Sequence, residues 1–114
     1  MVSDAALRKL EAIISDAAAR AVDWTARRND LVVDEKSAGQ FASNADVDIE
    51  ARLRRDLSAA FEETHILGEE LGGSLQAGAT GWAIDPIDGT SNFLLGLPLW
   101  GISVGYLEDG VSVM

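Results

Sequence analysis

The chain has 114 residues, 47% of them hydrophobic, and a formal net charge of -10. This length and composition predict one folded domain with a modest core, which we place over residues 1–114. The negative charge argues against nucleic acid or an anionic membrane surface as a partner, because like charges repel over a Debye length of about 8 Å. It favours a site that binds cations.

The sequence contains no cysteine, which excludes a disulfide framework and a thiolate site and is compatible with the cytoplasm. Its first residues include an early acid and no apolar core, unlike a signal peptide. No apolar run approaches the roughly 18 to 20 residues that a membrane-spanning helix needs. We therefore expect a soluble, cytoplasmic protein.

Residues 3–28 have the pattern of an amphipathic helix. Ser3 suits the N-cap and Asp4 suits the first turn. Apolar side chains then recur at three- and four-residue steps, at Leu7, Leu10, Ile14, Ala17, Ala21 and Trp24. Most charged residues lie off this stripe, so we expect them to face solvent.

A hairpin follows the first helix. Residues 31–33 and 40–43 predict two short strands, and the polar segment 34–39 predicts the turn between them. The hairpin leads directly into a second helix.

In that second helix, Asp46 suits the N-cap. Glu50 and Arg54 have the i,i+4 spacing of an ion pair. The expected buried stripe consists of Ile49, Leu53, Leu57, Ala60 and Phe61.

Residues 64–67 form an extended run that ends in Gly-Glu-Glu at 68–70, which places two acids at the end of a predicted strand. Alternation along a strand puts Glu70 on the opposite face from Glu69, where it is either a supporting acid near a site or a solvated one. His65 is the only histidine, and we expect a half-buried packing residue.

Residues 82–84 are a short apolar run that predicts a strand. Asp85 should occupy its last extended position, since Pro86 pushes the residue before it toward extended geometry. Pro86 then suits the second position of a tight turn, and Gly89 can adopt a backbone conformation that other residues avoid. Such a turn brings the carboxylates of Asp85 and Asp88 toward one point.

Beyond this turn, Gly-Thr-Ser-Asn at 89–92 offers hydroxyls and unpaired backbone N–H groups to an anion where a short helix starts. Converging carboxylates beside an anion site suggest a hard cation bridged to a phosphate, and Mg²⁺ is the natural candidate. The alternative is an ordinary surface turn. The apolar segments 82–84 and 93–95 favour the site, because surface turns are seldom framed in this way.

Residues 98–107 alternate as a strand, 108–110 predict a hairpin turn, and 111–114 begin the returning strand. The glycine-rich segment 71–80 predicts a loop. This order of elements predicts an α+β fold, a layered α/β sandwich with a largely antiparallel sheet and helices packed on one face. Because the chain stops inside a hairpin strand, we expect it to be truncated.

Residues 85–93, Asp-Pro-Ile-Asp-Gly-Thr-Ser-Asn-Phe, resemble the metal-binding signature of the inositol monophosphatase family of Mg²⁺-dependent, lithium-sensitive phosphatases. The match extends to Gly-Glu-Glu at 68–70, to Lys36 and to the segment 43–46. It covers essentially the whole chain but only the N-terminal half of such a protein. The resemblance implies a layered α/β/α/β/α sandwich with a second half to follow, and a homodimer for the full-length parent.

The resemblance also implies roles for individual residues. Glu69, Asp85 and the backbone carbonyl of Ile87 bind the first Mg²⁺. Asp88 binds a second ion, which Asp85 bridges to the first, and two such ions about 4 Å apart clamp the phosphate and activate the attacking water. The implied catalytic residues are Glu69, Thr90 and Asp46, and the implied phosphate-binding residues are Gly89, Thr90, Ser91 and Lys36.

Two functions from different classes stay open. The first is Mg²⁺-dependent hydrolysis of a small phosphate monoester, of the inositol or sugar monophosphate type, by metal-activated water. The second is a non-catalytic module that binds divalent cations or phosphate. Within the family, histidinol phosphate, fructose bisphosphate and nucleotide bisphosphates are alternative substrates, although residues 91–92 lack the lysine and glutamate of a nucleotidase. The family places a further aspartate in its C-terminal half, so we expect the 114-residue chain to be inactive alone.

Overall fold

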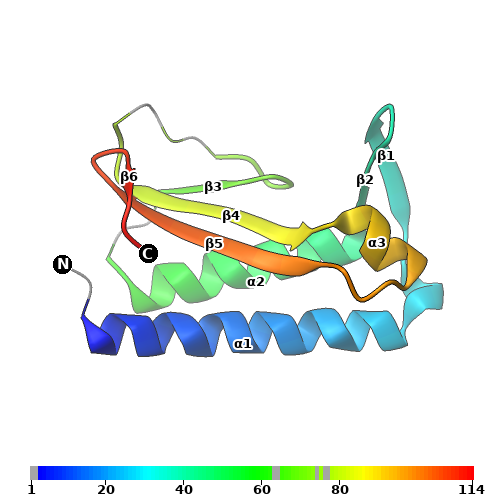
Figure 1. Cartoon of the computed structure of the whole chain (residues 1–114), viewed down its shortest axis with the longest axis horizontal. Coiled ribbons are helices and arrows are strands. Elements are labelled where there is room, and N and C mark those ends of the chain that lie inside the picture. Colours follow the sequence, from blue (N-terminus) through cyan, green and yellow to red (C-terminus); the bar gives the residue numbers. More distant parts are fainter. Residues whose placement is uncertain (1–2, 63–64, 74, 76–77) are drawn as a thin grey trace.

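The computed structural model describes residues 3–62, 65–73, 75 and 78–114. Two long helices, α1 (Asp4–Ala26) and α2 (Asn44–Ala60), lie along the same face of a sheet. A separate hairpin rises at one end of this layered body, beside a short third helix (Figure 1). The expected α+β arrangement with helices on one face of the sheet is confirmed.

Helix α1 begins as the sequence predicts. The hydroxyl of Ser3 accepts a hydrogen bond from the backbone N–H of Ala6 at 3.1 Å, which satisfies one of the free donors at the helix start. Its buried residues are Leu10, Ile13, Ala17, Ala21 and Trp24. The predicted stripe is therefore confirmed in its main part, although Leu7 is exposed and Ile13 takes the central place given to Ile14. A short 3-10 helix, η1 (Arg28–Asp30), ends the segment.

The predicted hairpin is present, but its first strand is displaced. Strand β1 (Val33–Ser37) pairs antiparallel with β2 (Gln40–Ser43), so the expected turn over 34–39 shrinks to 38–39. Backbone pairing with β2 requires no apolar side chain, and Gly39 adopts a φ of 77° that allows a tight reversal. A polar composition was therefore a poor guide to the end of the strand.

Ser43, not Asp46, is the N-cap of α2. Asp46 is the third helical residue, and its Oδ2 accepts hydrogen bonds from the backbone N–H of Ser43 at 2.8 Å and from the Ser43 hydroxyl at 2.7 Å. The prediction of Asp46 as the cap was wrong because a capping box has polar residues at both positions. The buried stripe at Ile49, Leu53 and Leu57 is confirmed, and the Glu50–Arg54 pair is present with an N–O distance of 3.2 Å.

The second sheet has the strand order β3-β4-β5-β6 within the described residues. Strand β3 (Ile66–Gly68) runs parallel to β4 (Gly81–Asp88), while β5 (Gly101–Glu108) and β6 (Val111–Ser112) continue it as antiparallel neighbours. The sheet is therefore mixed, with antiparallel pairing in its larger part. Helix α2 packs against β4, and α1 packs against β5.

Strand β4 does not stop at Asp85 as expected. It continues through Pro86 to Asp88, with a register shift against β5 between Asp85 and Asp88. Proline is tolerated there because pairing with β3 ends at Ile84 and the ladder to β5 is interrupted by the bulge. The reversal comes only at Gly89, whose φ of 87° starts the short helix α3 (Thr90–Leu95).

Two smaller expectations concern residues near the sheet. His65 is exposed, so its prediction as a half-buried packing residue was wrong. The expected strand start at Thr64 and part of the loop 71–80 lie outside the described residues. The hairpin turn at Asp109-Gly110 is confirmed, with both residues at positive φ as the twist of a two-residue hairpin turn requires.

The core lies between the two helices and the sheet. Trp82 at its centre contacts the rings of Phe61 and Tyr106, with centroids 5.0 Å and 4.7 Å away. Phe93 of α3 is fully buried and meets Trp100 edge-on, which joins α3 to the same core. In the described part of the chain, no helix is long and apolar enough to cross a membrane.

Candidate active site

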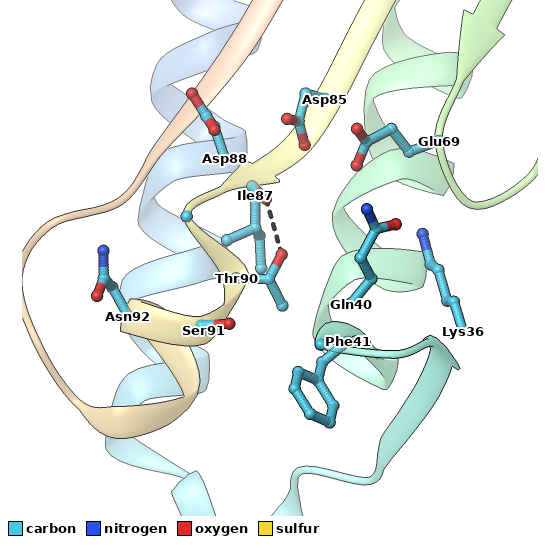
Figure 2. Close-up of a pocket in the computed structure, with 12 residues that line it drawn as sticks. Lys36, Gln40, Phe41, Glu69, Asp85, Ile87, Asp88, Thr90, Ser91 and Asn92 are labelled. Carbon is cyan, nitrogen blue, oxygen red and sulfur yellow. Dashed lines mark hydrogen bonds between the residues drawn. The ribbon is translucent and has the colours of Figure 1, made fainter.

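A cavity of about 570 Å³ opens between the hairpin, the end of β3, the bulge of β4 and the start of α3. Figure 2 shows side chains from these four segments facing it. Its lining residues are Lys36, Gly39, Gln40, Phe41, Glu69, Asp85, Ile87, Asp88, Gly89, Thr90, Ser91 and Asn92. Every residue predicted for metal or phosphate binding therefore lies around one cavity.

Three acids reach this cavity from two strands. Glu69 directly follows β3, whereas Asp85 and Asp88 lie on either side of the β4 bulge. In Figure 2 the carboxylates of Glu69 and Asp85 point toward one another, and Asp88 lies on the other side of Asp85. A tight turn was expected to bring Asp85 and Asp88 together. The bulge has this effect instead, because it changes the direction of the β4 side chains without ending the strand.

Asp85 lies between the other two acids. Burial raises the pKa of its carboxyl to about 6, with repulsion from Glu69 and Asp88 adding to the shift and the backbone N–H of Ile87 opposing it. Its Oδ1 is buried and has no hydrogen-bond partner among the described residues. A buried, unpaired carboxylate oxygen between two other acids is an unfavourable arrangement that a cation would relieve.

The donor set fits a hard divalent cation, since it consists of carboxylates and the backbone carbonyl of Ile87. Among the residues that the structure describes, no three acidic or histidine side chains already stand as ligands around a single point. The resemblance of residues 85–93 to the inositol monophosphatase signature implies the same kind of metal.

Thr90 lies at the base of the cavity, where its hydroxyl is 3.1 Å from Oδ1 of Asp46 and 3.0 Å from the carbonyl oxygen of Ile87 (Figure 2 shows the second contact). A hydroxyl has one proton, so it donates to one of these acceptors at a time. Asp46 is only 1% exposed and does not line the cavity itself. It reaches the site through Thr90, while Ser43 fixes its other oxygen.

Lys36 lies at the rim of the cavity on the hairpin. Its Nζ is 2.6 Å from Oε1 of Glu70, and this hydrogen bond raises the pKa of Lys36 despite an opposing effect of burial. The side chain of Glu70 is only 7% exposed and lines a neighbouring cavity beside Ser43. Glu69 and Glu70 therefore line different cavities, but as neighbours in the turn after β3 and not through the expected alternation along a strand. The interpretation of Glu70 as a solvated acid was wrong.

Gly89 must be glycine for two reasons. Its φ of 87° lies in the left-handed region, and a Cβ there would meet the backbone oxygen of Leu99 at 2.8 Å. Three lining residues, Gly39, Gln40 and Phe41, were missed by sequence reasoning. They lie in and just after the tight turn between β1 and β2, which the sequence placed over the wider polar segment 34–39.

A profile of the inositol monophosphatase family matches residues 5–114. The chain belongs to this family. It is 41% identical over 97 residues to a probable inositol 1-monophosphatase ImpA of Mycobacterium tuberculosis, which covers 84% of this chain and 35% of ImpA. It is 40% identical over 82 residues to a histidinol-phosphatase of the same organism, covering 72% of this chain and 32% of the relative.

The fold also matches that of a solved protein. The extragenic suppressor protein suhB from Bartonella henselae superposes with a TM-score of 0.88 at 26% identity, over 96% of this chain and 43% of that protein. The family and its named relatives are phosphatases. The chain spans between 32% and 43% of the length of these relatives.

Proposed function

We propose that this chain carries the metal- and phosphate-binding part of a Mg²⁺-dependent phosphatase that hydrolyses a small phosphate monoester, of the inositol or sugar monophosphate type. One observation carries the proposal: Glu69, Asp85 and Asp88 line a single cavity, and the nearest cation, Lys36, is engaged by Glu70. Three carboxylates around one cavity, with its lysine hydrogen-bonded to a fourth acid, form a ligand set suited to divalent cations.

Two ions would share these ligands. Glu69, Asp85 and the carbonyl of Ile87 would hold one, and Asp85 and Asp88 the other. Each ion would then take two carboxylates. Bound Mg²⁺ supplies charge that polarises the phosphate and lowers the pKa of water.

Thr90 would orient the attacking water. When its hydroxyl donates to Asp46, the lone pairs of its oxygen are free to accept a hydrogen bond from a water in the cavity. Asp46 is held by Ser43 and so fixes the direction of that hydroxyl. Glu69, on the opposite side of the cavity, is the second group assigned to this water.

The phosphate would lie at the start of α3. Gly89 and Ser91 line the cavity beside Thr90, and backbone N–H groups at the start of α3 would be available to the phosphate. Lys36 faces them across the cavity, and its positive charge would offset part of the phosphate charge.

A second candidate is a module that binds cations or phosphate without turnover, and histidinol phosphate is a second candidate substrate because a histidinol-phosphatase is among the relatives. A homodimer, a cytoplasmic location and a single domain over 1–114 stay predictions. We expect a phosphate-release assay to distinguish an enzyme from a non-catalytic module, and one candidate substrate from another.

The test is phosphate release by the whole protein, whether these 114 residues are all of it or a part, from inositol monophosphate, histidinol phosphate and fructose bisphosphate. We expect turnover with Mg²⁺, none after chelation, and none with Asp85→Asn, which removes a charged oxygen but keeps the shape. Asp109→Asn is the matched control, because Asp109 lies in an exposed turn at a φ of 51° that asparagine also adopts. Near-normal activity of Asp85→Asn would refute the proposal.

A further inference from the structure

Glu50 of α2 is completely buried, although nothing in the proposed chemistry uses it. We propose that Glu50, together with Arg54, is a positioning residue that holds the loop 68–73 and thereby aims the carboxylate of Glu69 into the cavity. The inference rests on the proposed role of Glu69 as a metal ligand. It names a residue that touches neither the metal nor the phosphate.

Both oxygens of Glu50 bind the backbone of this loop. Oε1 accepts a hydrogen bond from the N–H of Glu70 at 2.8 Å, and Oε2 accepts one from the N–H of Leu71 at 2.6 Å. Charge-assisted bonds of this kind are roughly twice as strong as neutral ones. The carboxylate therefore fixes the two peptide groups that follow Glu69.

The residue before Glu69 is fixed as well. A Cβ on Gly68 would lie 2.5 to 2.7 Å from the carboxyl atoms of Glu50, so the chain at this point passes directly against the acid. The N–H of Gly68 donates to the carbonyl of Gly72 at 2.9 Å, which folds the loop back on itself. Glu69 is thus held between two neighbours that both rest on Glu50.

Arg54 binds both Glu50 and the loop. Its Nε lies 3.2 Å from Oε2 of Glu50, and its Nη2 donates to the carbonyl of Gly72. One guanidinium therefore neutralises the buried acid and also binds the far side of the loop. A single turn of α2 holds both ends of the segment that presents Glu69.

This support matters because Glu69 itself is exposed and packing alone does not fix it. Burying a carboxylate is unfavourable unless it is paired and hydrogen-bonded, and well-packed apolar residues often replace buried ion pairs without loss of stability. Stability alone is therefore a weak reason for an acid at position 50. Aiming a metal ligand is a specific reason, since groups that orient metal ligands change metal affinity 10- to 100-fold.

The test measures Mn²⁺ binding by the whole protein, using the electron paramagnetic resonance signal of the free ion. Glu50→Gln keeps the shape but turns an NH₂ toward a backbone N–H and loses the ion pair, and we expect about tenfold weaker Mn²⁺ binding. Asp56→Asn is the matched control. It makes the same carboxylate-to-amide change on the same helix, at a side chain that contacts Arg55 and not the loop. We expect its Mn²⁺ affinity to equal that of the wild type.

A general loss of structure is separated from positioning by a double mutant. If Glu50 acts through Glu69, its substitution has little left to disturb in a Glu69→Gln background, and the tenfold effect should fall to less than about threefold. An equal loss of Mn²⁺ affinity in both backgrounds would overturn the inference.

Arg54→Lys covers the case in which Glu50→Gln fails to fold. The side chain of Arg54 is partly exposed, so lysine is tolerated, but it does not bind Glu50 and Gly72 together. We expect about threefold weaker Mn²⁺ binding, and unchanged affinity of this variant or of folded Glu50→Gln refutes the positioning role. A wild-type protein that binds no Mn²⁺ overturns the proposed function and this inference together.

Discussion

At the scale of single residues, two acids of the site, Asp85 and Asp46, have opposite surroundings. Asp85 is destabilised in its charged form by burial and by two neighbouring acids, whereas Asp46 is buried but satisfied by Ser43 and Thr90. The first arrangement attracts a cation and the second orients a hydroxyl. The two acids therefore differ in role because their hydrogen-bond partners differ.

Thr90 gives the sharpest prediction at this scale. Thr90→Ala should lower kcat by about 10² to 10⁴, because the variant loses the hydroxyl that orients the water. Mn²⁺ affinity should stay within about threefold of the wild type, since no carboxylate is changed. Thr90→Ser retains the hydroxyl and should keep most of the activity. Steady-state kinetics and Mn²⁺ titration check both, and lost Mn²⁺ binding with unchanged turnover per bound metal contradicts the assignment.

At the scale of elements, long-range contacts set the positions of short segments. The guanidinium of Arg28, just after α1, donates to the carbonyls of Phe93 and Leu94 at the C-terminal end of α3. A cation suits this end of a helix, where carbonyls lack intrahelical partners. The six-residue helix that presents Thr90 is thus held at its far end by a residue 65 positions earlier in the chain.

Asp48 joins α1 to α2 and gives a pH-dependent prediction. Burial raises the pKa of Asp48, but hydrogen bonds from Arg20 and Trp24, at 2.8 and 2.7 Å, outweigh it and hold the pKa below the usual 3.8. A pKa lowered by folding adds stability above about pH 3.8, and this stability is lost as the pH falls through the folded value. Asp48→Asn should therefore lower the free energy of unfolding by about 1–2 kcal/mol at pH 7.

The measurement is urea unfolding at pH 7 and at pH 3. The difference between Asp48→Asn and the wild type should shrink at the lower pH, because pH 3 lies below the usual pKa of 3.8 and protonation of the unfolded chain then opposes folding with a charged carboxylate. Asp16→Asn, an exposed acid on α1, is the control and should have little effect at either pH. A difference of equal size at both pH values would show that the carboxylate charge is not what joins the helices.

At the scale of the whole molecule, apolar side chains remain exposed at one end of the molecule and at one edge of the sheet. Strand β6 forms the edge of the sheet, and Val111 in it is exposed. The end of α3 and the segment that follows it add Leu95, Leu97 and Leu99, with exposed fractions of 73%, 46% and 69%. Exposed edges and apolar patches of this kind recruit other polypeptide.

We therefore predict that the 114-residue chain on its own self-associates and releases no phosphate. The resemblance implies a further metal-binding aspartate in the C-terminal half of family proteins, so the isolated chain should also bind Mg²⁺ weakly. Light scattering and a phosphate-release assay test this directly. A monodisperse monomer with full Mg²⁺-dependent turnover would show that the residues around this cavity suffice.

The candidate site was largely predictable because its residues are local in the sequence. Residues 85–91 supply most of the ligands, and their order of acid, proline, acid and glycine restricts the backbone whatever surrounds it. The path of that backbone was not predictable. Pro86 indicates a turn by its own preferences, and it lies in a strand only because β3 ends beside it and β5 is bulged.

The sequence by itself determined the elements whose cause is local. The cap at Ser3, the stripe of α1, the positive φ at Gly89 and the grouping of acids at 85 and 88 all follow from neighbouring residues. Only the tertiary structure decided which segments meet: the hairpin over the acids, Asp46 against Thr90, and Glu50 under the loop that carries Glu69. Contacts between residues 20 to 44 positions apart depend on how α2 packs beneath the sheet, and no local preference encodes that packing.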